Sequence, residues 1–299
     1  MAASGSRLAL AALALPLALA GCTQFAFVDD GTSVSWGLTN DGVLINGARL
    51  PTRGEDYWMP PRWAARGLHY GTDELASLVI YASREVAAEK PGPPLGVGNL
   101  SPRGGGPSRW HGSHQSGRDV DLLFYARAEG GERVALTEMV NFDEDGEARY
   151  PPAGEGAVVH FDVERNWLLV RSLVSNPIVP LQWIFVAEHL KDMMLAHAIA
   201  EGEPLGLILK ASYILHQPTN APPHADHFHV RTFCPVSDRS LGCRHRGWLR
   251  WAKKGEKYPE RPGRVARAEA VLEDLVALPV RSYLAFDLLT RQDALAAAR

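Results

Sequence analysis

The sequence predicts an α+β fold in which helices flank a central antiparallel sheet. Two short segments, residues 119–124 and 227–231, alternate polar and apolar side chains, as β-strands do. Three longer segments, residues 72–89, 162–174 and 187–201, carry apolar residues on one helical face. The chain has 299 residues, which is enough for one large domain of this kind with additional segments.

The elements expected before the first of these strands are a hairpin, a helix and a loop. Residues 42–47 are typical of a hairpin. Thr72 is followed by two acidic residues, a common start of a helix, and the proline-rich residues 90–94 end that helix. Residues 95–101 should then lead, as a strand and a turn, into a glycine-rich loop at residues 103–117.

The second half of the chain continues the mixture of strands and helices. Residues 143–156 are acidic and rich in glycine and proline, which indicates a surface loop. Residues 183–186 are expected to form a buried strand, and residues 207–216 another strand, antiparallel to the one at 227–231. Residues 256–299 are rich in Ala, Leu and Arg and are expected to form a C-terminal helical extension.

The most informative segment is the hexapeptide from His224 to His229, which holds three of the eleven histidines. On a strand, residues two apart point to the same face, so His227 and His229 would present both imidazoles on one side. Phe228 and Val230 would pack behind them. Two convergent imidazoles on a stiff element can hold a transition metal.

A catalytic zinc usually has three protein ligands, so partners for this pair are expected elsewhere in the chain. The best candidates are His114, in the glycine-rich loop, and Asp121, on the strand at 119–124. Gly112 and Gly117 would permit the backbone conformations that fold this loop back over the strand.

These paired motifs resemble those of the LAS metallopeptidases (the lysostaphin, D-alanyl-D-alanine peptidase and hedgehog type). The closer resemblance is to the penicillin-insensitive murein endopeptidases, whose first motif is similar to residues 113–121 and whose second is similar to residues 224–231. Further agreement lies at residues 165–167 and 184–186, and the resemblance covers roughly residues 40 to 250.

The resemblance implies a single zinc ion with three ligands, His114, Asp121 and His229. It also implies that His227 is the general base and that His224 is a second active-site histidine. The implied fold is a LAS-type domain, in which the central antiparallel sheet carries the zinc site.

His111 and Asp162 match positions that, by the same resemblance, face a second metal or the substrate. The histidine expected three residues after Asp162 is Arg165 in this chain. An arginine side chain stays protonated and cannot ligate a metal. We therefore expect one zinc ion rather than two.

The implied reaction is hydrolysis of the peptide crosslinks of peptidoglycan, with D-alanine on the carbonyl side and meso-diaminopimelate on the amine side. Zinc lowers the pKa of water from 15.7 to about 7 and polarises the scissile carbonyl, while His227 accepts the proton. The chain has no Gly-x-Ser-x-Gly motif and no Ser-x-x-Lys with Lys-Thr-Gly, so β-lactams have no activated serine to acylate.

Two alternative functions remain open. One is a D,D-carboxypeptidase or dipeptidase of the same superfamily that trims stem peptides. The other is a non-catalytic lipoprotein that binds the cell wall, although the presence of every ligand position favours an enzyme. The net charge of −3 argues against nucleic acid as a partner.

The N-terminus is typical of an exported lipoprotein. Arg7 precedes an apolar run at residues 8–20, which is shorter than the roughly 20 residues that span a bilayer. The sequence Leu-Ala-Gly-Cys that ends at Cys22 resembles a lipobox, so residues 1–21 should be a signal peptide and Cys22 a lipidated membrane anchor. Thr23 favours the outer membrane, which places the protein in the periplasm of a Gram-negative bacterium.

These assignments divide the chain into four parts. After the signal peptide we expect an N-terminal leader at residues 22–55, the LAS-type domain at 56–255 and the helical extension. Because Cys22 is used by the lipid, Cys234 and Cys243 remain, and they should form a disulfide in the oxidising periplasm.

Overall fold

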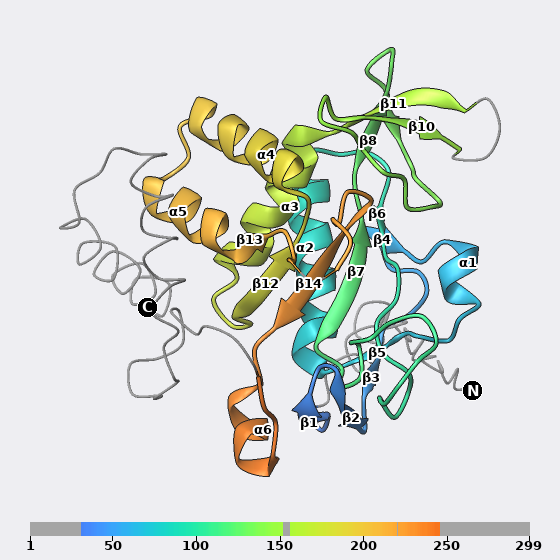
Figure 1. Cartoon of the computed structure of the whole chain (residues 1–299), viewed down its shortest axis with the longest axis vertical. Helices are drawn as coiled ribbons and strands as arrows, with labels where there is room; N and C mark the ends of the chain where they lie inside the picture. The colour runs from blue at the N-terminus through green and yellow to red at the C-terminus, as the bar shows by residue number, and fades with distance from the viewer. Residues whose placement is uncertain (1–30, 152–155, 220, 246–299) are drawn as a thin grey trace, which may run out of the picture.

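The computed structural model describes residues 31–151, 156–219 and 221–245. The expected signal peptide, Cys22 and the C-terminal extension at residues 256–299 therefore lie outside the described residues. Figure 1 shows a sheet near the centre of the described part, with helices packed on one side of it. The predicted α+β class is confirmed.

The central sheet has four strands in the order β13 (Leu215–His216), β12 (Leu181–Phe185), β14 (His227–Thr232) and β7 (Asp119–Leu123). β14 runs antiparallel to both β7 and β12, in keeping with the predicted antiparallel character of the central sheet. β13 pairs in parallel with β12, so the sheet is mixed rather than purely antiparallel.

Helices α2 (Asp73–Glu89) and α3 (Val163–Ser175) build the core beneath this sheet, and α2 passes behind β7 and β14 in Figure 1. Thr72 is the N-cap of α2, and its hydroxyl accepts a hydrogen bond from the backbone N–H of Leu75. Phe228 and Val230, on the inner face of β14, are fully buried in the same apolar core as α2. The alternation that predicted β14 therefore separates a core face from a histidine face.

The segment at residues 207–216 corrects the sequence prediction. It forms helix α5 (Leu205–Ile214), which follows α4 (Glu188–Ala200), and only its end forms the short strand β13. Ile208, Ala211 and Ile214 are the buried residues of α5, at the spacing of three that a helix requires. In a short, almost wholly apolar run this periodicity is hidden, and periodicity alone cannot separate a buried helix from a strand.

A second four-stranded sheet has the order β10 (Glu147–Tyr150), β11 (Ala157–Phe161), β8 (Ala126–Ala128) and β9 (Arg133–Val134). The prediction of a surface loop at 143–156 was thus wrong for β10, which pairs with β11 over four residues. The acidic residues 143–146 hid the strand, because they form the turn that precedes it.

The remaining short elements support the loops around the central sheet. β3 (Ala48–Arg49) pairs with β5 (Tyr70–Gly71), and β4 (Tyr57–Trp58) pairs with β6 (Leu95–Gly96) next to helix α1 (Pro61–Ala64). None of the helices in the described ranges is long and apolar enough to cross a membrane.

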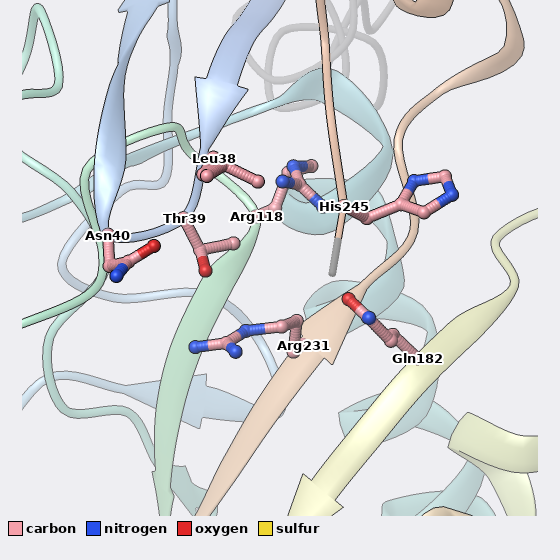
Figure 2. Close-up of a pocket in the computed structure, with 7 residues that line it drawn as sticks. All are labelled: Leu38, Thr39, Asn40, Arg118, Gln182, Arg231 and His245. Carbon is pink, nitrogen blue, oxygen red and sulfur yellow. The ribbon is translucent and has the colours of Figure 1, made fainter. Parts of the chain in front are cut away.

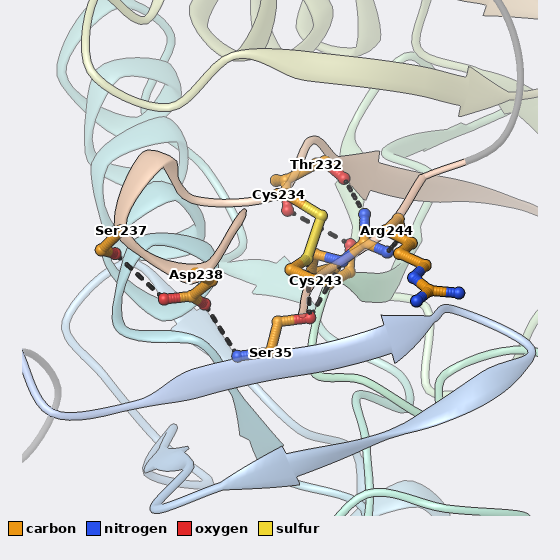
Figure 3. Close-up of a disulfide and its surroundings, with 8 residues drawn as sticks. Ser35, Thr232, Cys234, Ser237, Asp238, Cys243 and Arg244 are labelled. Carbon is orange, nitrogen blue, oxygen red and sulfur yellow. Dashed lines mark hydrogen bonds between the residues drawn. A yellow bond between two sulfur atoms is a disulfide. The ribbon is translucent and has the colours of Figure 1, made fainter. Parts of the chain in front are cut away.

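The end of β14 is tied to the beginning of the described chain. A hairpin of β1 (Val34–Leu38) and β2 (Asp41–Ile45) turns at residues 39–40, earlier than the predicted hairpin at 42–47. It lies beside helix α6 (Val236–Leu241), where the backbone N–H of Ser35 donates to Asp238 at 2.7 Å (Figure 3). The predicted disulfide between Cys234 and Cys243 is present and closes the loop that contains α6.

Candidate metal site

The candidate site forms where β7 and β14 pair. The register places His229 opposite Asp121 and Arg231 opposite Asp119. The loop before β7 adds His111 and His114, and the segment before β14 adds His224. The two sequence motifs therefore meet on one face of the central sheet.

The loop holds His114 in an unusual conformation. Its φ is +65°, in the left-handed region that costs energy for any residue other than glycine. Its backbone N–H donates to Asp119 at 3.0 Å, and its side-chain Nδ1 donates to the Leu100 carbonyl at 3.0 Å. These bonds direct the second ring nitrogen, Nε2, toward Asp121. Gly117 also has a positive φ of 77°, as expected, whereas Gly112 does not.

Three imidazole nitrogens converge on one carboxylate oxygen, Asp121 Oδ1. His114 Nε2 lies 3.3 Å from it, and His229 Nδ1 and His227 Nε2 each lie 3.5 Å from it. Asp121 is buried, and neither of its carboxylate oxygens has a hydrogen-bond partner among the described residues; the same holds for His114 Nε2. Buried polar atoms without partners are costly unless another group satisfies them. Nitrogen and carboxylate donors in this arrangement fit a metal ion.

Three overlapping sets of side chains have ligand atoms within 4.8 Å of one another, close enough to share an ion. They are His111 with His114 and Asp121, His114 with Asp119 and His229, and His224 with His227 and His229. His114 and His229 each belong to two of these sets, and the set of His114, Asp119 and His229 is buried throughout.

Asp119 organises the site and is itself completely buried. Its carboxylate accepts two hydrogen bonds from Arg231, from Nε at 2.6 Å and from Nη2 at 3.2 Å, and it lies 3.4 Å from His229 Nε2. Burial opposes ionisation of Asp119, but the charge of Arg231 and the contact with His229 outweigh it and hold its pKa well below the ordinary value. Asp119 therefore fixes both the His114 backbone and the His229 ring.

His227 forms a pair with the preceding residue, Asp226. The Nδ1–H of His227 donates to Asp226 Oδ1 at 2.6 Å, which leaves Nε2 directed toward Asp121. Burial disfavours the imidazolium, yet the carboxylates of Asp121 and Asp226 outweigh burial and raise the pKa of His227 to about 10. The two carboxylates thus make His227 a strong proton acceptor.

His111 and His224 lie on either side of this centre. The ring of His111 stacks on His114 with 4.1 Å between centroids, and its Nε2 accepts a hydrogen bond from the Asn99 amide at 2.6 Å. The ring of His224 lies 5.0 Å from that of His227. Burial, followed by repulsion from neighbouring histidines, lowers the pKa of His111 and of His224 to about 4, so both are neutral at pH 7.

Asp162 is placed apart from these groups. It begins α3, where its carboxylate accepts the backbone N–H of Arg165, and it forms an ion pair with Arg127 at 3.1 Å. It belongs to none of the sets of metal-binding side chains found in the described ranges. Its carboxylate therefore has a structural explanation that needs no second metal.

Sequence reasoning missed two side chains that orient the histidines, Asp226 and Asn99. Asp226 precedes His227 directly, and a carboxylate next to a candidate base is a signal that the sequence offered. Asn99 carried no such signal, because its contact with His111 depends on how the glycine-rich loop folds back over β7.

Comparison with known proteins agrees with this geometry. A family model described as penicillin-insensitive murein endopeptidase matches residues 35–250, which is most of the chain and includes every residue of the site. No curated protein gives a match. The chain belongs to the penicillin-insensitive murein endopeptidases, a family of LAS-type metallopeptidases that act on peptidoglycan.

Proposed function

We propose that this protein is a zinc peptidase that hydrolyses the peptidoglycan crosslink between D-alanine and meso-diaminopimelate. The observation that supports the proposal most strongly is the convergence of His114 Nε2 and His229 Nδ1 on Asp121 Oδ1, at 3.3 and 3.5 Å. Membership of the family supplies the substrate class, because its members cleave peptides of the cell wall.

The donor set supports zinc in particular. Two imidazoles and one carboxylate, from His114, His229 and Asp121, are the ligands that a catalytic zinc commonly has. When bound, zinc would polarise the scissile carbonyl and make a neighbouring water more acidic. The hydrogen bond from His114 Nδ1 to the Leu100 carbonyl leaves Nε2 as the ligand nitrogen and fixes the ring.

His227 is proposed as the general base. Asp226 accepts a hydrogen bond from the Nδ1–H of His227, so Nε2 faces the cluster and can accept a proton from the attacking water. The positive charge of a zinc ion bound at Asp121 would repel the imidazolium of His227. This repulsion would lower the high pKa of His227 and leave the ring neutral near pH 7. His227 could then pass the proton to the leaving amine, a role that contributes on the order of 10²–10⁴-fold in rate.

His224 is proposed as a hydrogen-bonding contact for the substrate. Its Nδ1 is buried and has no hydrogen-bond partner among the described residues. Its pKa of about 4 keeps it neutral, so one ring nitrogen can donate and the other can accept. His111 lies on the other side of the centre, where a hydrogen bond from Asn99 holds its ring. Its side chain would form the boundary of the site there.

Substitution His229→Ala tests the proposal. The variant should lose both zinc and the hydrolysis of purified sacculi, because one of three ligands is missing. His160→Ala is the matched control, since His160 lies on β11 with 38% of its side chain exposed, outside the cluster. Unchanged hydrolysis by His229→Ala would refute the mechanism.

The products of the same digestion separate the crosslink activity from its alternative. An endopeptidase converts crosslinked dimers into monomers. Release of free D-alanine without loss of dimers would instead identify a carboxypeptidase that trims stem peptides.

The substrate places the active domain at the cell wall, in the bacterial envelope. We further propose that Cys22 is lipidated and anchors the chain to the outer membrane. Substitution Cys22→Ser should move the full-length protein from the membrane fraction to the soluble periplasmic fraction. Retention of the variant in the membrane fraction would exclude this anchor.

A further inference from the structure

A cavity lies next to the metal site, between the β1–β2 turn and the ends of three other segments. Its volume is about 220 Å³, and it is lined by residues 38–40, Arg118, Gln182, Arg231 and His245 (Figure 2). Arg231 connects the cavity to the site, because it follows His229 by two residues on β14 and binds Asp119. Asp119 in turn lies 3.4 Å from His229.

Arg118 brings a buried positive charge to this cavity. Its side chain is completely buried, and its three nitrogens donate to neutral oxygens, those of Ser35 Oγ, the Thr232 carbonyl and the Arg244 carbonyl. None of the carboxylates in the described ranges forms an ion pair with it. Burial lowers the pKa of Arg118 to about 10, which leaves it charged at neutral pH.

Arg231 adds donors on the side of the metal site. Its Nε and Nη2 are bound to Asp119, and no hydrogen bond of Nη1 is formed within the described ranges. In Figure 2 the Arg231 guanidinium extends toward Asn40, which is exposed on the opposite rim. The lining residues include two arginines and no acidic side chain. A guanidinium donates paired, charge-assisted hydrogen bonds that match the geometry of a carboxylate.

We propose that this cavity binds the free carboxylate carried by the carbon atom that bears the scissile nitrogen. The inference rests on the proposed function and extends it to the amine side of the substrate. In the crosslink, the leaving nitrogen belongs to an amino-acid centre of meso-diaminopimelate whose own carboxylate is free. That carboxylate is only a few bonds from the scissile carbonyl, so its binding site has to adjoin the metal site, as the cavity does.

The cavity would act on specificity and orientation rather than on the proton transfers. A carboxylate held at Arg231 and Asn40 would fix the leaving amine relative to His227, which has to protonate it. A stem peptide with an amide at the same position would lack both the charge and the acceptor for the guanidinium. The loss of one charge-assisted hydrogen bond corresponds to roughly tenfold to a hundredfold in kcat/KM.

The experiment compares three synthetic crosslinked dimers with the full-length, zinc-loaded protein. One carries all its carboxylates, one has an amide in place of the carboxylate beside the scissile nitrogen, and one has an amide at the C-terminal D-alanine. We expect only the second dimer to be cleaved at least tenfold more slowly. Equal rates for all three, or slowing confined to the third, would overturn the proposal.

A charge change at the rim tests the cavity itself. Asn40→Asp places a negative charge where the substrate carboxylate would lie, and Asn40 is exposed, so the fold should tolerate it. The variant should lose most of its preference for the carboxylate dimer over the amidated one. Asn46→Asp, with the same change on the exposed far end of the same hairpin, should retain it. Retention of the full preference by Asn40→Asp would overturn the proposal.

A binding measurement distinguishes failure of this proposal from failure of the proposed function. If none of the dimers is cleaved, the peptidase assignment fails. Calorimetric titration of the same dimers then tests the cavity alone. Tighter binding of the carboxylate dimer than of the dimer amidated beside the scissile nitrogen, lost in Asn40→Asp, supports the site, whereas equal binding overturns it.

Discussion

At the scale of single residues, the site depends on side chains whose hydrogen bonds leave one nitrogen free. His114 is bound through Nδ1 to a backbone carbonyl, and His227 is bound through Nδ1 to Asp226. In each ring the opposite nitrogen faces Asp121. Such supporting contacts set which nitrogen can ligate a metal or accept a proton.

Substitution of Asp226 tests this support directly. Asp226→Asn would keep the size of the side chain but remove the carboxylate that orients His227 and makes it more basic. We expect kcat for a crosslinked dimer to fall on the order of 10 to 100-fold with little change in KM, because only the base is disturbed. Asp192→Asn, on helix α4, is the control and should keep the full kcat. A wild-type kcat in Asp226→Asn would remove Asp226 from the mechanism.

The candidate ligand residues could be named from sequence, since alternation placed Asp121 and His229 on strands, where they lie opposite each other on one face of the sheet. Their neighbours were harder to identify. The left-handed conformation of His114 and the contact of Asn99 with His111 arise from loop folding, which no local pattern encodes.

At the scale of elements, β7 and β14 present the site by packing their other faces into the core. Phe228 is fully buried beside His227 and His229, with its ring edge-to-face against Phe124 at 4.6 Å. Strands with such alternation, and helices with a clear cap such as α2, were predictable from sequence. Helix α5 and strand β10 were not. The sequence of α5 is mostly apolar, which hides its helical period, and β10 has only four residues, too few for its alternation to stand out.

Truncation of the packed face should destabilise the protein. Phe228→Ala is expected to lower the free energy of unfolding by about 3–5 kcal/mol, because it leaves a cavity beneath the histidines. Urea unfolding of the full-length protein measures the change. Ile178→Ala, at a side chain that is 79% exposed, should change it by less than about 0.5 kcal/mol. Equal stability of the two variants would contradict this account of the sheet.

At the scale of the whole molecule, the histidine cluster couples stability to pH. The pKa of His111 and of His224 is about 4 in the folded protein, against an ordinary value of 6.5. Between these values the unfolded chain binds protons that the folded protein does not, so acidification favours unfolding. His227 acts in the opposite sense: its raised pKa, about 10, stabilises the fold below pH 6.5, and this contribution is lost as the pH rises toward 10.

The metal-free protein should therefore lose thermal stability as the pH falls from about 6.5 to about 4. His224→Gln would remove one of the buried histidines whose pKa is lowered, so its Tm should fall less steeply over this range than that of the wild type. Scanning calorimetry after treatment with a chelator measures both slopes. Identical slopes would show that burial of His224 does not oppose its protonation.

At the same scale, the chain that leaves β14 is held in place by three features: the hairpin β1–β2, the disulfide and α6. The cysteine pair was predictable from the count of cysteines once Cys22 was assigned to the lipid. The contact of Ser35 with Asp238 joins residues 203 positions apart, and such long-range pairing could not be read from the sequence.

The most direct test of the central claim is the zinc content and activity of the full-length protein before and after chelation. The account predicts about one zinc per chain, loss of sacculus hydrolysis when zinc is removed, and recovery when it is restored. Full hydrolysis by protein that contains no metal would contradict it.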